Sequence, residues 1–280
     1  MKYSRTALME LTHRYRNVLK KCALINATIL MSAVFATPVM ATPTDVDTWA
    51  DLQTALTTGS DVKATANMTP SGVLTVTGKT NTLDLNGKTL DAGGTSAGTS
   101  GLIFSGGSLT LTGGGTFAGF NNPDTAPASV NGSEYGALDL RAGATLTMTG
   151  GDWIFSENTS GLGALNTYNA GMDANVNSIS FANNKSNSQG AGLRHDVTTT
   201  ASSPVARITA DMLQFVNNSF VEAEGAVAGS GAGVLNSRGR MELLAAGTAF
   251  NGNHMNANIA SGRTYKVGGG AIANLNHFFM

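Results

Sequence analysis

Apolar and polar residues alternate with period two in several short segments of the chain. In four of them apolar residues alternate mainly with threonine or aspartate between glycines or Asn-Gly turns: residues 72–78, 81–87, 107–115 and 143–151. Alternation over four to eight residues, bounded by turn residues, is typical of β-strands that bury one face. The pattern therefore predicts a fold built from many short strands.

One segment after residue 41 has helical periodicity instead. We predict a helix over residues 47–59, with Asp47 as its N-cap and Gly59 at its end. Its apolar residues fall on one helical face: Trp49, Leu52, Ala55 and Leu56. A short helix followed by many evenly spaced strands predicts an all-β fold with a helix capping its start.

Two short motifs alternate along the second half of the chain. The first, Phe-x-x-Asn, begins at Phe155, Phe181, Phe215 and Phe250. The second, Gly-Ala followed by an aliphatic residue with at most one extra glycine, begins at Gly136, Gly163, Gly190, Gly231 and Gly270. The Phe motifs lie 26, 34 and 35 residues apart, and a strand pattern precedes each one. These intervals suit one turn of a parallel solenoid with loops of different length.

The residue types of the two motifs suit stacked turns. In a β-helix each turn buries its apolar face only against its neighbours. Phenylalanine fills such an interior, and asparagine tolerates a left-handed turn and can hydrogen-bond to its neighbour in the next turn. Gly-Ala lets the backbone turn tightly where turns stack. We therefore predict one parallel β-helix domain over residues 42–280, with the four Phe residues in its core.

The N-terminal segment has the composition of a signal peptide. Residues 1–41 hold six Lys or Arg and one acid, followed by an apolar run from Cys22 to Ala36 and a small-residue exit at Ala41. A membrane anchor needs roughly 20 apolar residues, and this run is shorter. We expect export across the inner membrane and cleavage after Ala41. No later apolar segment is long enough to predict a transmembrane helix in the mature chain.

Removal of residues 1–41 changes the charge balance. It takes six of the 17 basic residues and one of the 18 acidic residues, so 11 stand against 17 in the mature chain. Because no basic stripe remains, the composition argues against nucleic acid as a partner. The chain's one cysteine, Cys22, leaves with the leader, so burial and hydrogen bonds must hold the exported protein together.

The motifs resemble those of a known family. "GGAIAN" (269–274) and "FANN" (181–184) are similar to the repeats of polymorphic outer membrane proteins, surface proteins of the autotransporter class. The motifs at Gly163, Gly190 and Gly231 depart from that wording. The opening "ADLQTAL" (50–56) with the strands that come after it resembles pectin-lyase-like right-handed β-helices, and the long basic leader resembles autotransporter signal peptides. The resemblance covers most of residues 47–274.

The resemblance implies a right-handed β-helix passenger, secreted or displayed at the outer membrane, that adheres to glycans or proteins of host or neighbouring cells. Autotransporters end in a barrel of amphipathic strands of about ten residues. The chain stops at "NLNHFFM" instead, which suggests a truncated remnant or one part of a split system, periplasmic if no translocator serves it. Residues 268–280 hold no charged residue or proline, so we also expect self-association through the last turn.

Candidate catalytic residues are few. Ser96 lies in a Gly-x-Ser-x-Gly match, but this motif needs a strand before it and a helix after it. His195-Asp196 suggests an acid–base pair, yet neighbours on a strand point to opposite faces, and a solvated loop is the simpler interpretation. His254 and His277 lack the spacing of metal ligands.

The acids lie singly along the chain, as at Asp84, Asp139, Asp152 and Asp211. We therefore predict a protein that is not an enzyme, with no catalytic, cofactor-binding or metal-binding residues. The alternative is a carbohydrate-active β-helix enzyme, a lyase or hydrolase, whose site assembles across turns.

Overall fold

A computed structural model of the chain shows parallel β-sheets and, among the residues that it describes, one α-helix. It describes residues 42–280, apart from 95–100, 123–135, 188–189, 199–203, 222–230, 238, 257–269, 275–276 and 280. The chain divides into two compact units, Met1–Thr42 and Pro43–Met280, and the sheets and the helix belong to the second.

The strands form three sheets, of twelve, seven and five strands. The twelve-stranded sheet contains β1 (Thr44–Val46), β2 (Val62–Ala64), β4 (Thr80–Asp84), β5 (Thr89–Asp91), β7 (Ser108–Thr112), β8 (Gly115–Ala118), β11 (Thr145–Thr149), β12 (Asp152–Ser156), β15 (Gly171–Ala182), β18 (Val205–Val216), β21 (Arg240–Asn251) and β24 (His277–Phe279). The seven-stranded sheet contains β3 (Val73–Thr77), β6 (Gly101–Ser105), β10 (Leu138–Arg141), β14 (Leu165–Tyr168), β17 (Leu193–Asp196), β20 (Val234–Ser237) and β23 (Ile272–Asn274). The five-stranded sheet contains β9 (Asn121–Asn122), β13 (Thr159–Ser160), β16 (Lys185–Ser186), β19 (Ser219–Val221) and β22 (His254–Asn256).

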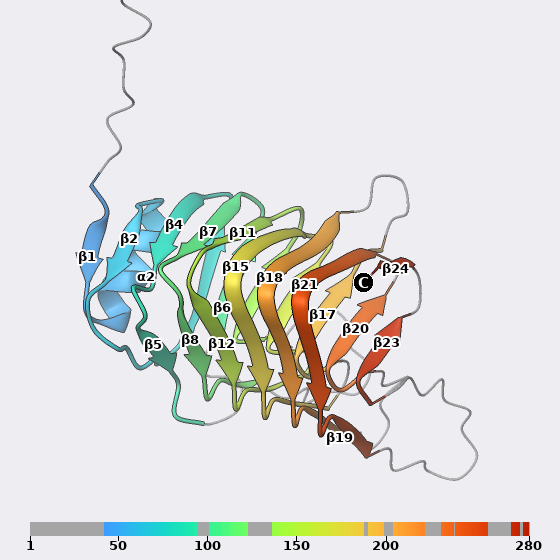
Figure 1. Cartoon of the computed structure of the whole chain (residues 1–280). Helices are drawn as coiled ribbons and strands as arrows, with labels where there is room; N and C mark the ends of the chain where they lie inside the picture. The colour runs from blue at the N-terminus through green and yellow to red at the C-terminus, as the bar shows by residue number, and fades with distance from the viewer. Residues whose placement is uncertain are drawn as a thin grey trace, which may run out of the picture. The chain divides into compact units, whose positions relative to one another are not determined.

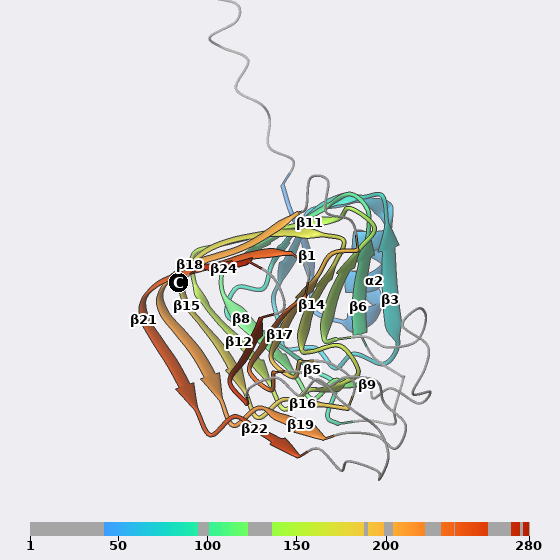
Figure 2. The same cartoon turned by 90° about the vertical axis from the view of Figure 1, so that its right-hand side faces the viewer.

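The chain visits the sheets in a repeating order. From β10 onward it runs through the seven-stranded, the twelve-stranded and the five-stranded sheet, and then returns to the first. Each strand pairs in parallel with the strand one circuit later, as β14 does with β17 and β17 with β20. The four predicted strands correspond to β3, β4, β7 and β11, so the all-β, parallel class is confirmed. Figures 1 and 2 show these strands side by side along the three sheets.

The longest strands run through a corner of the twelve-stranded sheet. β15, β18 and β21 each have 12 residues, and β15 pairs with β11 in its first half and with β12 in its second. Between β11 and β12 the same corner is made by Gly150 and Gly151, both at positive φ. Later circuits therefore replace a glycine corner by a continuous bent strand (Figure 1).

Phenylalanine side chains stack through the core. Phe155, Phe181 and Phe215 are fully buried, as predicted, and neighbouring rings lie 4.9–5.2 Å apart with interplanar angles of 5–14°. The stack begins one circuit earlier than the motif indicated, at Phe117, which is in register with Phe155. Phe250 ends the stack and is half-buried, because within the described residues β24 pairs with β21 only along Arg240–Glu242. No strand among the described residues therefore pairs with β21 at Phe250 on the edge that faces away from β18.

The asparagines of the Phe-x-x-Asn motif form a ladder. Asn158, Asn184 and Asn218 are fully buried, and Asn253 continues the row. Each Nδ2 donates to Oδ1 of the next asparagine, over 2.8–2.9 Å. It also donates to the carbonyl of the phenylalanine one circuit earlier: Asn184 Nδ2 to Phe155 O is 2.9 Å. The predicted hydrogen bonds between turns are confirmed, and each ladder asparagine links three successive circuits.

The left-handed position of this turn is not the ladder asparagine. The residue just before it has positive φ: Glu157 (57°), Asn183 (55°), Asn217 (52°) and Gly252 (64°). Our assignment of the left-handed conformation to the motif asparagine was therefore wrong. The preceding residue turns the chain, which leaves the ladder side chain pointing into the interior.

The predicted helix is α2, Trp49–Thr58. Its N-cap is Thr48 and not Asp47, since Thr48 Oγ1 accepts a hydrogen bond from the Asp51 amide at 3.2 Å. Gly59 ends the helix at φ 90°, as predicted. The predicted apolar face is buried, and α2 packs against β1, β2 and β3 at the first circuit (Figure 1).

The phenylalanine stack predicts a large effect of truncation at its centre. We expect Phe215→Ala to lower the free energy of unfolding by about 3–5 kcal/mol, because the ring is buried between two others. Met212→Ala on the same strand is the control; Met212 is 41% exposed, so its loss should cost under about 0.5 kcal/mol. Urea unfolding measures both, and an equal loss in the two variants would contradict the packing.

The ladder predicts a comparable effect without loss of apolar area. Asn184→Ala should cost roughly 2–4 kcal/mol, because it removes the buried hydrogen bonds that the Asn184 side chain makes with the Phe155 carbonyl and with its neighbours in the ladder. Asn183→Gly at the exposed left-handed position should change stability by less than about 0.5 kcal/mol. If thermal or urea unfolding gave equal effects for these adjacent positions, the ladder would not be a main source of stability.

Candidate functional site

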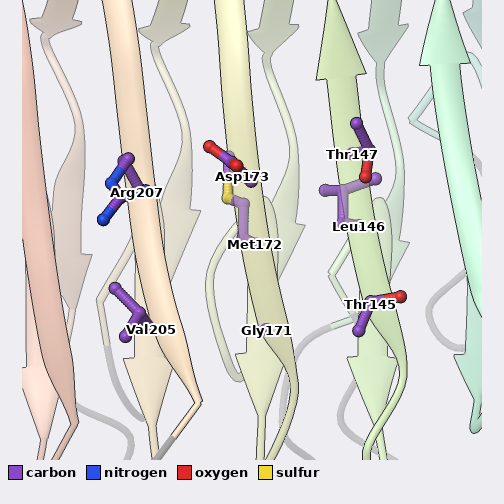
Figure 3. A pocket seen from close by; sticks show the side chains of 8 residues that line it. All are labelled: Thr145, Leu146, Thr147, Gly171, Met172, Asp173, Val205 and Arg207. Carbon is purple, nitrogen blue, oxygen red and sulfur yellow. The ribbon is translucent and has the colours of Figure 1, made fainter.

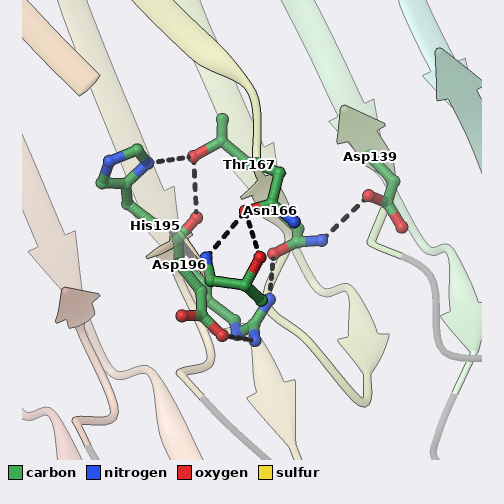
Figure 4. Close-up of polar contacts among 8 residues, drawn as sticks. Asp139, Asn166, Thr167, His195 and Asp196 are labelled. Atoms are coloured by element: carbon green, nitrogen blue, oxygen red, sulfur yellow. Dashed lines mark hydrogen bonds and ion pairs between the residues drawn. The ribbon is translucent and has the colours of Figure 1, made fainter. Parts of the chain in front are cut away.

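A network of charged and polar side chains is buried on one face of the seven-stranded sheet (Figure 4). β10, β14 and β17 are in register, so Asp139, Asn166 and Arg194 lie in one row. Asn166 Nδ2 donates to Asp139 Oδ1 at 2.8 Å, and Arg194 Nη1 donates to Asn166 Oδ1 at 2.8 Å. Asp196 accepts from Arg194 Nη2 at 2.6 Å, and Arg141 donates to Asp139 from Nε and Nη2. We call these five residues the charged network.

The charged network holds its carboxylates in ion pairs. Asp139, Arg194 and Asp196 are 0–3% exposed, and each acid contacts an arginine two residues away on its own strand. Burial raises the pKa of Asp139, and the bonds from Arg141 and Asn166 offset part of that rise. Because both carboxylates are enclosed and paired, the network suits fixing the register of three strands better than acid–base chemistry on a ligand.

His195 lies on the opposite face of β17 from Asp196, as alternation predicts. Its Nδ1 is 2.7 Å from Thr167 Oγ1, and its Nε2 is 3.2 Å from the Pro204 carbonyl. A carbonyl can only accept, so Nε2 carries the proton and Nδ1 accepts from the threonine hydroxyl. Desolvation lowers the pKa of His195 to about 4. The expected solvated loop was wrong: both residues lie on a buried strand, because it pairs on both edges with neighbouring circuits.

The other sequence candidates do not converge. Ser96 lies outside the described residues, and so does the side chain of His277. Asp84 accepts from the Asn86 amide, Asp152 accepts from Ser178 Oγ, and Asp211 and His254 are exposed. Among the described residues no group of three or more His, Cys, Asp or Glu could hold a metal ion.

Hydroxyl side chains line the outer face of the twelve-stranded sheet. Pairing of β4, β7 and β11 places them in three rows, which we call the hydroxyl rows: Thr80, Ser108 and Thr145; Thr82, Thr110 and Thr147; Thr112 and Thr149. Parallel strands lie about 4.8 Å apart, and residues two apart on one strand are roughly 6.6 Å apart. The rows therefore present donors and acceptors on a fixed two-dimensional spacing.

A hollow interrupts this face where the rows reach β15 and β18 (Figure 3). The hollow, which we call the trough, has a volume of about 320 Å³. Its lining residues come from β11, β15 and β18: Thr145, Leu146, Thr147, Gly171, Met172, Asp173, Val205 and Arg207. Sequence reasoning missed it, although the replacement of Thr145-x-Thr147 by Gly171-x-Asp173 in the next circuit was a usable signal.

Ion pairs close the trough toward β21. Arg207 Nε donates to Glu242 Oε2 at 2.6 Å, and Arg240 also contacts Glu242. The Arg207 guanidinium lowers the pKa of Glu242, so this carboxyl is ionised at neutral pH. Figure 3 shows Arg207 and Asp173 on neighbouring strands at the same level of the trough.

Comparisons with known proteins give no relative. No family model, no curated protein and no solved structure matches the chain. Within the described residues, no helix is long and apolar enough to cross a membrane.

The lowered pKa of His195 predicts a pH effect on stability. In the unfolded chain the histidine titrates near 6.5, and in the folded chain near 4, so the unfolded state binds more protons between these values. Stability should therefore fall as pH drops through this window, by roughly 2 kcal/mol between pH 7 and pH 5. Urea unfolding of wild type and His195→Gln at both pH values measures this, because the variant should lack that part of the pH dependence.

His254→Gln is the matched control, since His254 is exposed. It should retain the pH dependence of the wild type. The same pH dependence in wild type and His195→Gln would show that His195 is not held neutral by burial.

Proposed function

We propose that the three sheets are the faces of a right-handed parallel β-helix and that the protein is an exported, non-catalytic binding scaffold. The repeating visit to each sheet supports the solenoid, since a β-helix builds its faces in that way. The resemblance of its motifs to autotransporter passengers and the basic, apolar leader support export to the cell surface or the medium.

The observation that carries the binding role is the outer face of the twelve-stranded sheet. Its hydroxyl rows are regular, and their residues are exposed or half-buried. The charged side chains of the seven-stranded sheet, by contrast, bond to one another. A flat array of hydroxyls suits weak, repeated contacts with a polyhydroxylated surface, so we propose cell-surface glycans as the partners. Many such contacts give firm adhesion through avidity.

A carbohydrate-active enzyme is the second candidate. The observation that favours it is Asp173, an exposed carboxylate in a trough beside Arg207. Glycoside hydrolysis commonly uses two carboxylates that flank the bond to be broken. Asp173 is the one acidic residue among those that line the trough, so we place binding ahead of cleavage.

Self-association is a further property that we propose for the last circuits. On the edge of β21 that faces away from β18, residues 243–251 have no strand partner among the described residues, and Leu244 is 48% exposed. An open edge with an apolar side chain is a template for pairing with another chain. Light scattering of the purified chain tests this, and a monomer at tens of micromolar would contradict it.

The binding role is tested with an array of neutral and acidic glycans and the purified full-length chain. We expect binding without release of reducing ends or unsaturated products. Thr110→Val with Thr112→Val removes two hydroxyls from one strand of the rows and should weaken binding at least threefold. Thr75→Val with Thr77→Val is the control, because it removes an equal pair from β3, outside the rows. New reducing ends or unsaturated products would favour the enzyme, and no glycan binding would contradict the role.

A further inference from the structure

The trough exists because one position in an outward row carries no side chain. Gly171 stands between Thr145 on β11 and Val205 on β18, at the level where its neighbours have side chains. Its φ lies outside the left-handed region, and a Cβ built there would meet nothing closer than 3.9 Å. Neither the backbone nor the packing requires glycine here. The hollow therefore marks a position where a side chain fits and is missing.

The polar groups around the trough are open to a ligand. Thr145, Thr147 and Asp173 are exposed, and their side chains have no hydrogen-bond partner within the part of the chain that the structure describes. Arg207 bonds to Glu242 through Nε, which leaves the N–H groups of its two terminal nitrogens. The trough thus offers an acceptor, several donors and two hydroxyls that can serve as either. A ligand hydroxyl is both donor and acceptor, and it suits this mixture.

The charged groups around the trough balance one another. Arg207 and Arg240 both pair with Glu242, and Arg207 also interacts with Asp173, so two arginines face two carboxylates. A ligand with a net charge of either sign would therefore gain no excess attraction here. The Thr145 methyl group and the Pro204 Cβ lie beside Gly171, each 3.9 Å from a Cβ built there, and they offer apolar contact to the C–H face of a ring.

We propose that the trough binds one neutral sugar ring of a glycan. This inference rests on the proposed function, and it names the ligand class and the residues of one subsite on that face. A volume of about 320 Å³ lies at the lower end of the usual range for ligand pockets, about 300–1,000 Å³, so it suits a single ring. Asp173, Thr147 and the terminal nitrogens of Arg207 are the groups that bind the hydroxyls. The site is shallow, and we expect a dissociation constant of the order of millimolar.

The experiment titrates the purified full-length chain with methyl glycosides of glucose, galactose, mannose and N-acetylglucosamine. Binding is followed by saturation-transfer NMR and by the backbone amide shifts of Thr147, Gly171 and Asp173. At least one glycoside should bind and shift these amides. Gly171→Thr fills the hollow and should weaken binding at least tenfold, while Thr147→Val should weaken it roughly three- to tenfold through loss of one hydrogen bond. Thr75→Val on β3 is the control and should leave binding unchanged.

Asp173→Asn separates neutral from cationic ligands. The amide oxygen still accepts, so a neutral sugar should keep its affinity within about threefold, whereas a cation held by the carboxylate would be lost. Equal binding by Gly171→Thr and wild type, or glycan-array binding without shifts at the trough, would overturn the subsite and leave the proposed function standing. An array without any binding overturns both. Thermal unfolding of each variant tests whether it is folded. If Gly171→Thr does not fold, the effect of Thr147→Val on glycoside binding tests the subsite instead.

Discussion

The fold depends on keeping each circuit of the chain in register with the next, and the asparagine ladder is the interaction that fixes this register. A parallel strand slipped by one residue would turn its apolar side chains outward. Each ladder asparagine prevents this slip, because its amide bonds to groups of the preceding and the following circuit at once. The bonds are buried, so a shifted register would leave several polar groups without partners. The phenylalanine stack supplies apolar burial directly beside this ladder.

A second polar row serves the seven-stranded sheet in a different way. Asp139, Asn166 and Arg194 link three successive strands through side chains alone, and each acid is neutralised by an arginine on its own strand. Removing one charged side chain would leave its partner buried and unpaired, whereas replacing the whole row by apolar residues could be tolerated. The row thus makes the stability of this sheet depend on matched residues from separate circuits. The two sheets therefore differ in their outer polar groups, since the hydroxyl rows of the twelve-stranded sheet are exposed or half-buried.

The features that depend on residues close together in the sequence could be predicted. Those that depend on the register between strands of different circuits could not. The four strands and the capping helix follow from periodicity within a few residues, and the Phe motif indicates its own burial. The Phe-x-x-Asn motif did not identify Phe117, because Phe120 occupies the position of the motif asparagine. The Phe120 backbone amide donates to Asn158 Oδ1 instead. His195 looked solvated because Thr167 and Pro204, which enclose it, lie in other parts of the circuit. The trough depends on which residue of β15 pairs with Thr145. This register could not be derived from the sequence, because the loops between circuits differ in length.

The asparagine ladder also gives the molecule an electrical direction. Every side-chain amide donates toward the following circuit, so the individual dipoles add along the row, as peptide dipoles do along an α-helix. The row starts with Asn158 Oδ1, which accepts the Phe120 amide, and its positive end lies at Asn253. Polarised chains of hydrogen bonds strengthen with each added member. A side chain placed next to Asn253 in a further circuit would therefore bind more strongly as a hydrogen-bond acceptor than as a donor.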